Sequence, residues 1–561
     1  MHAMRYFLLL SALLALFSAG CRSDRSGMSD AMNRFADGFT VQTVLDEPSN
    51  DLSDSCRRIA IDSLRSRLRR LTALDTMTMD TDSRIDWRFA HSLLMGQLLE
   101  LERMGFYGKD PRLYMRFAAL SALIAAPSDS VKKPAEVEQR LRAVPAQLRH
   151  GREQLRTFVP RFQELALFMA ENSLVLFDQE LPAFISRSGA AGTKLQEPLV
   201  AARSAVLDFI TFLKTDLPKR PAGDFAIGKS VYDSMLRHQF LTRGSSDSLL
   251  RFARSAFAAT IGEMEQLARK LDSTKSWQEG IEIIRRQAPA PSRMLVSHQR
   301  WVDKSREHIL KNDLMPIHWP ERVRVVPRAV YLRKTSYYGN FSMARAKDKD
   351  GFFTSEWMIN PPEDHWTRPQ MEDYMLEHDW GVIVVTAPHE TYGGHHIQGL
   401  YQMHNPRRIR RENSISLFGE GWGLYNEQLM QETGFFPNEK VHLRQLQLRL
   451  WRIARVIYDV GMHTGLMTYE DAIRLMTDEV RFKRWSAQLE IDAATAAPGY
   501  FIGYYTGMAE ILSMREDFMK VRGDRYTHRD FHERLLKSGS MPPVLMRRAL
   551  FAGLEADPEV H

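Results

Sequence analysis

Cysteine is nearly absent from this chain, whose 561 residues include only Cys21 and Cys56. If the first is modified, the second has no partner within the chain, so a disulfide framework is excluded and stability must come from packing. A strong excess of one charge is also missing. The formal net charge of +7 is mild and dispersed, which argues against nucleic acid as a partner. No repeat of fixed period stands out.

Long apolar runs are missing as well, except at the N-terminus. Residues 1–20, MHAMRYFLLLSALLALFSAG, combine a basic start, an apolar segment and small residues directly before Cys21. This pattern predicts a signal peptide, because the segment is short for a membrane span. A cysteine at the cleavage site resembles a lipobox, although Ser18 stands where an aliphatic residue is usual. We expect an exported protein of the periplasm or cell envelope, with lipid on Cys21 as its membrane anchor and a freely secreted form as the alternative.

The rest of the chain predicts a mainly α-helical protein with one small β-sheet. Residues 21–40 are polar and small, as in a flexible tether. From 41 to 320 apolar residues recur at three- and four-residue steps, which predicts a lobe of antiparallel helices. Between about 322 and 360, VRVVPRAVYL and GFFTSEWMINP are rich in β-branched and aromatic residues and predict short strands. Residues 321–561 would form a second lobe that holds this sheet and further helices.

The chemistry concentrates in residues 388–399, PHETYGGHHIQG, which hold three histidines and a glutamate. In the common zinc-peptidase helix two histidines lie four residues apart. Here His395 and His396 follow His389 at six and seven residues. On a regular helix the first would lie on the far side, and the second roughly 10 Å along the axis. The spacing therefore predicts a distorted helix, for which the two glycines provide conformational freedom.

A chance cluster of histidines on an exposed turn is the alternative to a metal site. The motif follows the apolar run WGVIVVTAP, however, so its polar groups enter a region where unsatisfied polar atoms are costly. A third ligand is expected from LFGEGWGLYNEQLMQETG, where Glu420 lies 25 positions after His395. Two histidines and one glutamate leave a fourth position for water, as at a catalytic zinc ion. Glu420 could instead be an acid favoured by the dipole at a helix N-terminus.

A second polar pattern lies on an otherwise apolar helix, RIARVIYDVGMH. Arg455, Asp459 and His463 recur every four residues and form one stripe. A charged stripe on a buried helix must be paired or must line a cavity. One interpretation is an internal salt bridge that closes the core. The other is a functional arrangement, in which Asp459 orients Arg455 and His463 points toward the metal.

Five segments in succession resemble the motifs of a bacterial family known as domain of unknown function 885. They are HETYGGHHIQ, EGWGLYNE, RVIYDVGMHTG, PGYFIGYYTG and FHERLLKSGSMP, within residues 385–542. The resemblance extends from about residue 40 to the C-terminus. This sequence departs from the family pattern at Gly393, where proline is usual, and at Tyr500, where glutamine is frequent. The family is grouped with the zincin-like metallopeptidases, which implies a large multi-helical zincin-like fold with a small sheet beside the active-site helix.

The resemblance also bears on the paired histidines. Matching Gly394 and His395 to the Gly-His of related zinc carboxypeptidases and oligopeptidases favours His395 as the ligand. His396 would then contact the metal ligands or the substrate, and the reverse assignment stays open.

The expected function is hydrolysis of a peptide or small amide by a carboxypeptidase, dipeptidase or oligopeptidase with one zinc ion per chain. Glu390 would be the general base, and Tyr504, which matches a tyrosine recurrent in the family, or His463 would stabilise the oxyanion. The strand FFTSEWMINP would pair with an extended substrate. Hydrolysis of a non-peptide amide or ester, and a non-catalytic binding lipoprotein, stay open as alternatives. The expected site residues are the metal ligands His389, His395 and Glu420, the catalytic groups Glu390, Tyr504 and His463, and the substrate contacts Arg455, Asp459 and His396.

Overall fold

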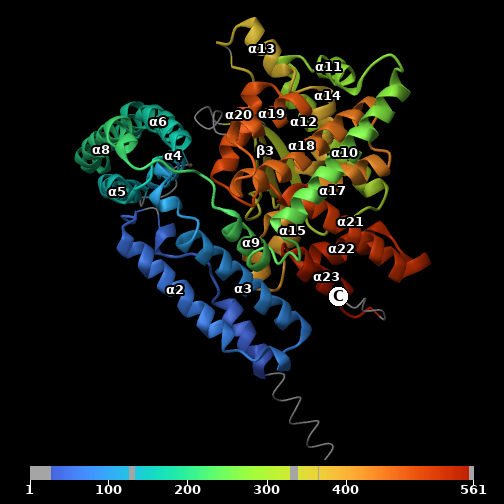
Figure 1. Ribbon diagram of the computed structural model, residues 1–561, viewed down its shortest axis with the longest axis horizontal. Coiled ribbons are helices and arrows are strands. Elements are labelled where there is room, and N and C mark those ends of the chain that lie inside the picture. The colour runs from blue at the N-terminus through green and yellow to red at the C-terminus, as the bar shows by residue number, and fades with distance from the viewer. Residues whose placement is uncertain (1–26, 48, 126–132, 329–338, 364, 555–561) are drawn as a thin grey trace, which may run out of the picture. The chain divides into compact units, whose positions relative to one another are not determined.

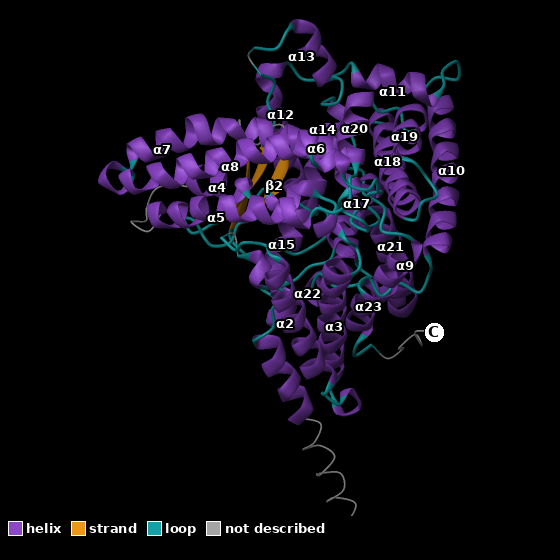
Figure 2. Cartoon of the chain, turned by 60° about the vertical axis from the view of Figure 1, so that its left-hand side comes forward, coloured by secondary structure: helices purple, strands orange, loops and turns teal. Residues whose placement is uncertain are grey.

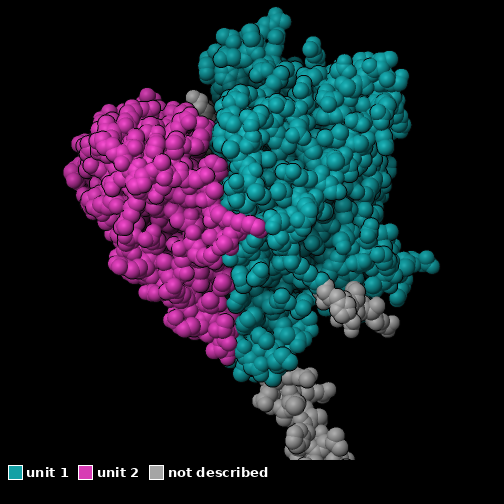
Figure 3. All heavy atoms as spheres, in the orientation of Figure 1, with its two compact units in different colours: residues 1–39, 74–92, 232–561 teal, residues 40–73, 93–231 magenta. Residues whose placement is uncertain are grey.

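The computed structural model describes residues 27–47, 49–125, 133–328, 339–363 and 365–554. The chain divides into two compact units, which Figure 3 colours separately. Unit 1 comprises residues 1–39, 74–92 and 232–561, and unit 2 comprises residues 40–73 and 93–231. The division does not fall at residue 320, as expected from the helical periodicity. The reason is that the helices between residues 246 and 311 pack on helices of the C-terminal part of the chain.

Unit 2 is built from helices that bury one apolar face each, as the periodicity predicted. The helix α5 (Lys133–Gln154) packs against α4 (Phe117–Ala125) and α8 (Gln196–Thr215), and α8 also packs against α6 (Pro160–Val175). The remaining helices of this part of the chain are α2 (Asp54–Thr72) and α7 (Leu181–Arg187). Two helices, α3 (Thr81–Glu102) and α9 (Lys229–His238), contribute residues to both units.

Unit 1 contains the sheet and the other helices (Figure 1). In chain order these helices are α10 (Ser246–Leu271), α11 (Trp277–Arg285), α12 (Met294–Lys311), α13 (Arg368–Met375), α14 (Trp380–Glu390), α15 (His395–Met403), α16 (Arg408–Glu412), α17 (Ser416–Glu432), α18 (Glu439–His463), α19 (Tyr469–Arg474), α20 (Arg484–Thr495), α21 (Gly503–Arg522), α22 (His528–Ser538) and α23 (Pro543–Phe551). The helix α18 is enclosed by α10, α14 and α21, and every side chain from Leu450 to His463 is buried. Its charged residues must therefore find partners inside the unit.

The small sheet predicted between about residues 322 and 360 is present, and Figure 2 shows its strands among the helices. The strand β1 (Glu321–Pro327) pairs in parallel with β3 (Phe353–Ile359), and β2 (Asn340–Ser342) pairs antiparallel with β3. The sheet lies against α12 through β1, and α12 packs on α14. Because β3 is the central strand, both of its edges are occupied over residues 356–358. It therefore cannot pair there with a substrate, contrary to the expectation from its sequence.

The expected tether over residues 21–40 is partly helical instead. Residues 27–37 form a helix, and Met32, Ala36 and Phe39 are each no more than 5% exposed. Met32 and Ala36 lie four residues apart and share one face of this helix, and Phe39 is buried just after its end, although their neighbours are small and polar. Cys21 and the expected signal peptide lie outside the described residues. Within those residues, none of the helices has the length and apolar character needed to cross a membrane.

Two glycines allow α17 and α21 to cross at very short range. A Cβ atom on Gly507 would overlap the carbonyl oxygen of Leu417, and one on Gly421 would lie 2.6 Å from the backbone of Gly507. This crossing sets Glu420, on α17, beside the first turn of α21, which carries Tyr504. The packing of two glycines thus positions two of the predicted site residues.

We expect Gly507→Ala to lower the free energy of unfolding by about 1–3 kcal/mol, because a carbonyl of α17 can avoid the added methyl only if the helices separate. Gly262→Ala in α10 is the matched control, since no atom lies within 4 Å of its Cβ position. The control should be neutral or slightly stabilising through helix propensity. Urea unfolding followed by circular dichroism compares the two variants. Equal midpoints would show that the crossing tolerates a side chain.

Candidate functional site

The motif PHETYGGHHIQG spans a break between two helices. The helix α14 ends at Glu390, and α15 begins at His395. Between them Gly393 has φ +100°, a conformation that favours glycine, and a Cβ atom on Gly394 would overlap the carbonyl oxygen of His389. The helix is distorted, as the histidine spacing predicted, but by a complete interruption rather than a bulge.

Side chains of α17 satisfy the backbone groups that this break exposes. The indole Nε1 of Trp422 donates to the carbonyl oxygen of Gly393 at 2.7 Å, and Nδ2 of Asn426 donates to that of Pro388 at 3.0 Å. Both side chains are fully buried. Because buried carbonyl groups need donors, these two bonds hold the interrupted segment against α17.

One face of α17 receives the ring of His389. Glu420, Gly423 and Glu427 follow one another at three- and four-residue spacing and share this face. The ring lies over Gly423, where a Cβ atom would come within 2.7 Å of it. Its Nδ1 is 2.8 Å from Glu427 Oε1, and its Nε2 is 3.9 Å from Glu420 Oε2. An ionised carboxylate only accepts hydrogen bonds, so Nδ1 donates to Glu427, and Nε2 faces Glu420.

His395 is oriented in the same way from α15. Gln398 donates through Nε2 to the carbonyl oxygen of Phe418 at 3.4 Å, which turns its Oε1 toward Nδ1 of His395 at 3.3 Å. Since the amide oxygen accepts, Nδ1 of His395 donates to it, and Nε2 faces Glu420 Oε2, 3.5 Å away. Burial lowers the pKa of His395, but the Glu420 carboxylate outweighs this effect and raises the pKa to about 9.

Tyr500 fixes the third member of the cluster. Its hydroxyl donates to Glu420 Oε1 at 2.6 Å, which leaves Oε2 for the two histidines. Burial raises the pKa of Glu420, but His395, His389 and Tyr500 together lower it well below its usual range. The sequence marked Tyr500 only as a departure from the family pattern, and its hydrogen bond to Glu420 emerges from the structure.

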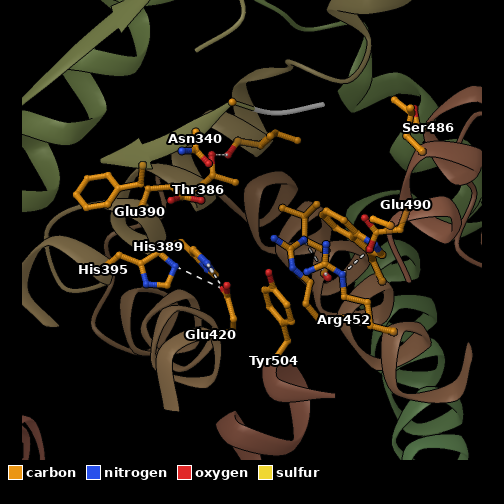
Figure 4. Close-up of a pocket in the computed structure, with 18 of the residues that line it drawn as sticks. Asn340, Thr386, His389, Glu390, His395, Glu420, Arg452, Ser486, Glu490 and Tyr504 are labelled. Carbon is orange, nitrogen blue, oxygen red and sulfur yellow. Dashed lines mark hydrogen bonds and ion pairs between the residues drawn. The ribbon is translucent and has the colours of Figure 1, made fainter. Parts of the chain in front are cut away.

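The geometry of the three side chains fits a zinc ion. One ligand atom from each of His389, His395 and Glu420 lies within 4.8 Å of the others (Figure 4). Two atoms bound about 2.1 Å from one tetrahedral ion lie roughly 3.4 Å apart, close to the 3.5 and 3.9 Å that separate the Nε2 atoms from Glu420 Oε2. The Nδ1 atoms of both rings are held by acceptors, as is usual for metal-binding histidines.

His396 takes no part in this cluster. Its Nδ1 is 2.9 Å from Ser355 Oγ and its Nε2 is 2.9 Å from Glu321 Oε2, and the ring is fully buried. One residue beyond His395 on a helix, it points about 100° away, toward the sheet. It holds α15 against β1 and β3 and does not line the pocket described next, contrary to the expectation that it contacts substrate.

A cavity of about 560 Å³ lies beside the cluster, and His389, His395 and Glu420 form part of its wall. Glu390 and Tyr504, two of the expected catalytic groups, also line it. Figure 4 shows Glu390 on one side of the cluster and Tyr504 on the other. A cavity of this size is typical of sites for small molecules or short peptides.

The polar stripe of α18 divides between two environments. Arg455 lines the cavity and pairs with Glu490, whose Oε1 is 2.5 Å from its Nε. It does not pair with Asp459, as one interpretation of the sequence had it. Asp459 accepts hydrogen bonds from the backbone of Gly499 at 2.9 Å and Phe501 at 3.1 Å, so it holds the segment that contains Tyr500. It is fully buried and has no place in the cavity wall, so it is not a substrate contact.

His463 also lies away from the cavity. Its Nε2 is 2.9 Å from the carbonyl oxygen of Ala494, and its ring stacks on Tyr232. Each four-residue step turns a helix side chain by about 40°, so His463 points about 80° away from Arg455. This rotation removes it from the expected position near the metal ligands. Of the expected oxyanion donors, Tyr504 alone lines the pocket.

Several residues that support the His–Glu cluster or line the pocket were not anticipated from the sequence. Glu427 follows Glu420 by two helical turns, and this spacing is the signal that could have identified it. Gln398 lies one turn after His395. Arg452 and Glu490 carried no local signal, because their positions in the pocket depend on how α18 and α20 pack.

We expect the purified chain to bind one zinc ion, and His395→Ala or Glu420→Ala to lose most of it, because each removes one of three ligands. His396→Ala should retain zinc, since that ring is engaged by Ser355 and Glu321. Elemental analysis after dialysis measures the occupancy. Loss of zinc from His396→Ala together with full occupancy in His395→Ala would reverse the assignment of the paired histidines.

Asp459 should make stability depend on pH. Burial raises its pKa to about 7, although the hydrogen bonds from Gly499, Tyr232 and Phe501 oppose the shift. Between about pH 4 and 7 the folded chain then holds a proton that the unfolded chain has lost, so stability falls as pH rises, by up to about 1.4 kcal/mol per unit.

The difference in free energy of unfolding between the natural chain and Asp459→Asn isolates this effect. It should decrease with pH over that range in urea titrations. A difference that stays constant or rises would mean that Asp459 is ionised in the folded state throughout.

Comparison with known proteins places the chain in a family. No curated protein matches it. A protein from Shewanella oneidensis, designated a lipoprotein of unknown function, has the same fold, with 20% sequence identity, a TM-score of 0.77 and coverage of 96% of this chain and 99% of the other. A protein from Colwellia psychrerythraea, also designated a lipoprotein, shares 16% identity at a TM-score of 0.74, over 94% of this chain and 96% of the other. The family described as bacterial protein of unknown function (DUF885) matches residues 36–550, and the chain belongs to that family.

Proposed function

We propose that the chain is a zinc-dependent hydrolase whose substrate is a peptide or a small amide. The proposal is carried by the convergence of His389, His395 and Glu420 on the wall of a cavity that also holds the carboxylate of Glu390. Three protein ligands with an open side toward a cavity are typical of catalytic zinc, whereas structural zinc is closed by four. The hydrogen bonds that orient both imidazoles before any ion binds also favour a metal site over a chance cluster.

We infer further that the arrangement is zincin-like. His389 and Glu390 are adjacent at the end of α14, the second histidine begins the next helix, and the glutamate comes from α17. Adjacent residues on a helix point about 100° apart, so Glu390 faces the cavity while His389 faces α17. The three-stranded sheet near α14 and α15 completes the likeness to this class of hydrolase.

Different residues would carry out different steps of the proposed hydrolysis. A bound zinc ion would supply Lewis acidity and lower the pKa of a water molecule to about 7. Glu390 accepts a proton from the attacking water and passes it to the leaving nitrogen. Tyr504 donates its hydroxyl to the oxyanion. Burial and the nearby Glu420 raise the pKa of Tyr504 above its usual range, so the hydroxyl stays protonated and remains a donor.

Export and lipid anchoring at Cys21 belong to the same proposal. The N-terminal sequence has the pattern of a lipoprotein signal, and two proteins of the same fold are designated lipoproteins. A hydrolase held at the membrane through Cys21 would act on substrates in the cell envelope.

We expect Glu390→Gln to retain zinc and fold while it slows hydrolysis by about 10²–10⁴-fold, because the change keeps the size of the side chain and removes its basicity. Turnover is measured by mass detection of products from a mixed library of short peptides, and zinc by elemental analysis. Glu372→Gln, at an exposed ion pair on α13, is the matched control and should behave like the natural chain.

The outcomes separate the possible roles of this glutamate. Loss of zinc from Glu390→Gln would make the residue a ligand or a support for one. Unchanged turnover would remove it from catalysis. A zinc-loaded natural chain that hydrolyses no member of the library would contradict a peptidase.

A further inference from the structure

Two buried arginines line the cavity on the side away from the His–Glu cluster. Arg452 and Arg455, both on α18, are 5% and 6% exposed. The ring of Trp451 lies within cation–π distance of both, 3.9 Å from the guanidinium carbon of Arg452 and 4.2 Å from that of Arg455. Figure 4 shows Arg452 and Glu490 across the cavity from His389 and His395.

Among the described residues, an acceptor anchors one N–H group of Arg455. A guanidinium carries five such groups. Its Nε donates to Glu490 Oε1, and that same oxygen also accepts from Trp451 Nε1 at 3.0 Å and Tyr458 Oη at 2.8 Å. Within the described part of the chain, no acceptor is recorded for the two Nη groups of Arg455. Donors that line a cavity and lack a protein partner call for an acceptor from outside.

The anchoring also determines which edge of the guanidinium is presented. Glu490 holds Nε, and the rings of Trp451 and Tyr504 lie against the faces of the guanidinium, so the edge formed by the two Nη groups remains available. That edge matches the two oxygens of a carboxylate, which it binds with two parallel hydrogen bonds. Arg452 adds a second positive charge to the same wall and reaches Glu427 Oε1, the partner of His389, at 3.8 Å.

The cavity is therefore divided by charge. Glu390 and Glu420 lie beside the histidines that would hold zinc, Arg452 and the Arg455–Glu490 pair form another part of the wall, and Trp451, Phe482 and Tyr504 supply aromatic wall. We propose, on the basis of the proposed function, that Arg455 with Arg452 binds the C-terminal carboxylate of a short peptide. The enzyme would then remove residues from the C-terminus, with preference for an apolar or aromatic final side chain.

The first test measures binding without turnover. N-acetyl-phenylalanine and its amide differ only in the carboxylate, so calorimetric titration of each into the zinc-loaded chain isolates its contribution. The acid should bind at least about tenfold more tightly than the amide, as charge-assisted hydrogen bonds do. Equal affinities would overturn the proposal, and this comparison needs no variant that has to fold.

Arg455→Lys is the second test, because lysine keeps the positive charge but lacks the two parallel N–H donors of the guanidinium edge. The preference for acid over amide should fall by at least about threefold, while affinity for the amide stays the same. Arg449→Lys is the matched control: Arg449 lies on the same helix and pairs with Glu263, outside the cavity wall. An unchanged preference in Arg455→Lys would refute the role of Arg455. A weaker affinity for both ligands would point to a structural role instead.

Turnover then separates this inference from the proposed function. Peptides with a free C-terminus should be cleaved at least about tenfold faster than the same peptides with a C-terminal amide, and should release their last residue. Equal cleavage of both would uphold the hydrolase and refute the carboxylate site. Absence of any cleavage, with selective binding of the acid that Arg455→Lys weakens, would uphold the carboxylate site and refute the hydrolase.

Discussion

The position of the His389 ring between two carboxylates of α17 is the constraint on which the site depends. The ring occupies the space over Gly423, with Glu420 on its Nε2 side and Glu427 on its Nδ1 side. This contact requires α14 and α17 to approach closely, which the interrupted backbone after Glu390 permits. The same segment of α17 also provides the donors that satisfy the interruption and the glycine that packs against α21. One helix thus supplies a proposed ligand, the carboxylate that orients a second proposed ligand, and the crossing that positions Tyr500 and Tyr504.

A second constraint is the burial of charge on α18. This helix is enclosed on all sides, yet it carries Arg444, Arg452, Arg455 and Asp459. Arg444 pairs with Asp379 at 2.9 Å at the start of α14, Arg455 pairs with Glu490, and Asp459 accepts from the backbone that leads into α21. Buried charges are tolerated only when paired, so each pair determines where a neighbouring element must lie. The walls of the cavity are in this way determined by electrostatics as much as by apolar packing.

These two constraints together produce a cavity with chemically different ends. In one part of the wall imidazoles and a carboxylate face one another at spacings suited to a metal ion, and in another part the guanidinium groups of Arg452 and Arg455 line the cavity. The two interpretations of the α18 stripe, an internal salt bridge or a functional surface, are therefore compatible. Glu490 neutralises and orients Arg455, and the remaining edge of the same guanidinium stays available to the cavity. The chain belongs to the bacterial family and shares its fold with two proteins designated lipoproteins, while the proposed chemistry rests on the residues of this chain alone.

The sequence by itself determined the mainly helical architecture, the location of the small sheet, and the grouping of His389, His395 and Glu420. Each of these follows from local periodicity or spacing, and the interval between His389 and His395 predicted a distorted helix, although not its complete interruption. Only the tertiary structure decided that β3 is central, that Arg455 pairs with Glu490, and that His396 and His463 lie away from the cavity. The helical periodicity also could not locate the boundary between the units, since α10 and α12 pack on helices far along the chain. Such partners lie tens or hundreds of residues apart in the sequence. Which of them meet depends on how whole helices pack and on the direction, to within a few tens of degrees about the helix axis, in which each side chain points.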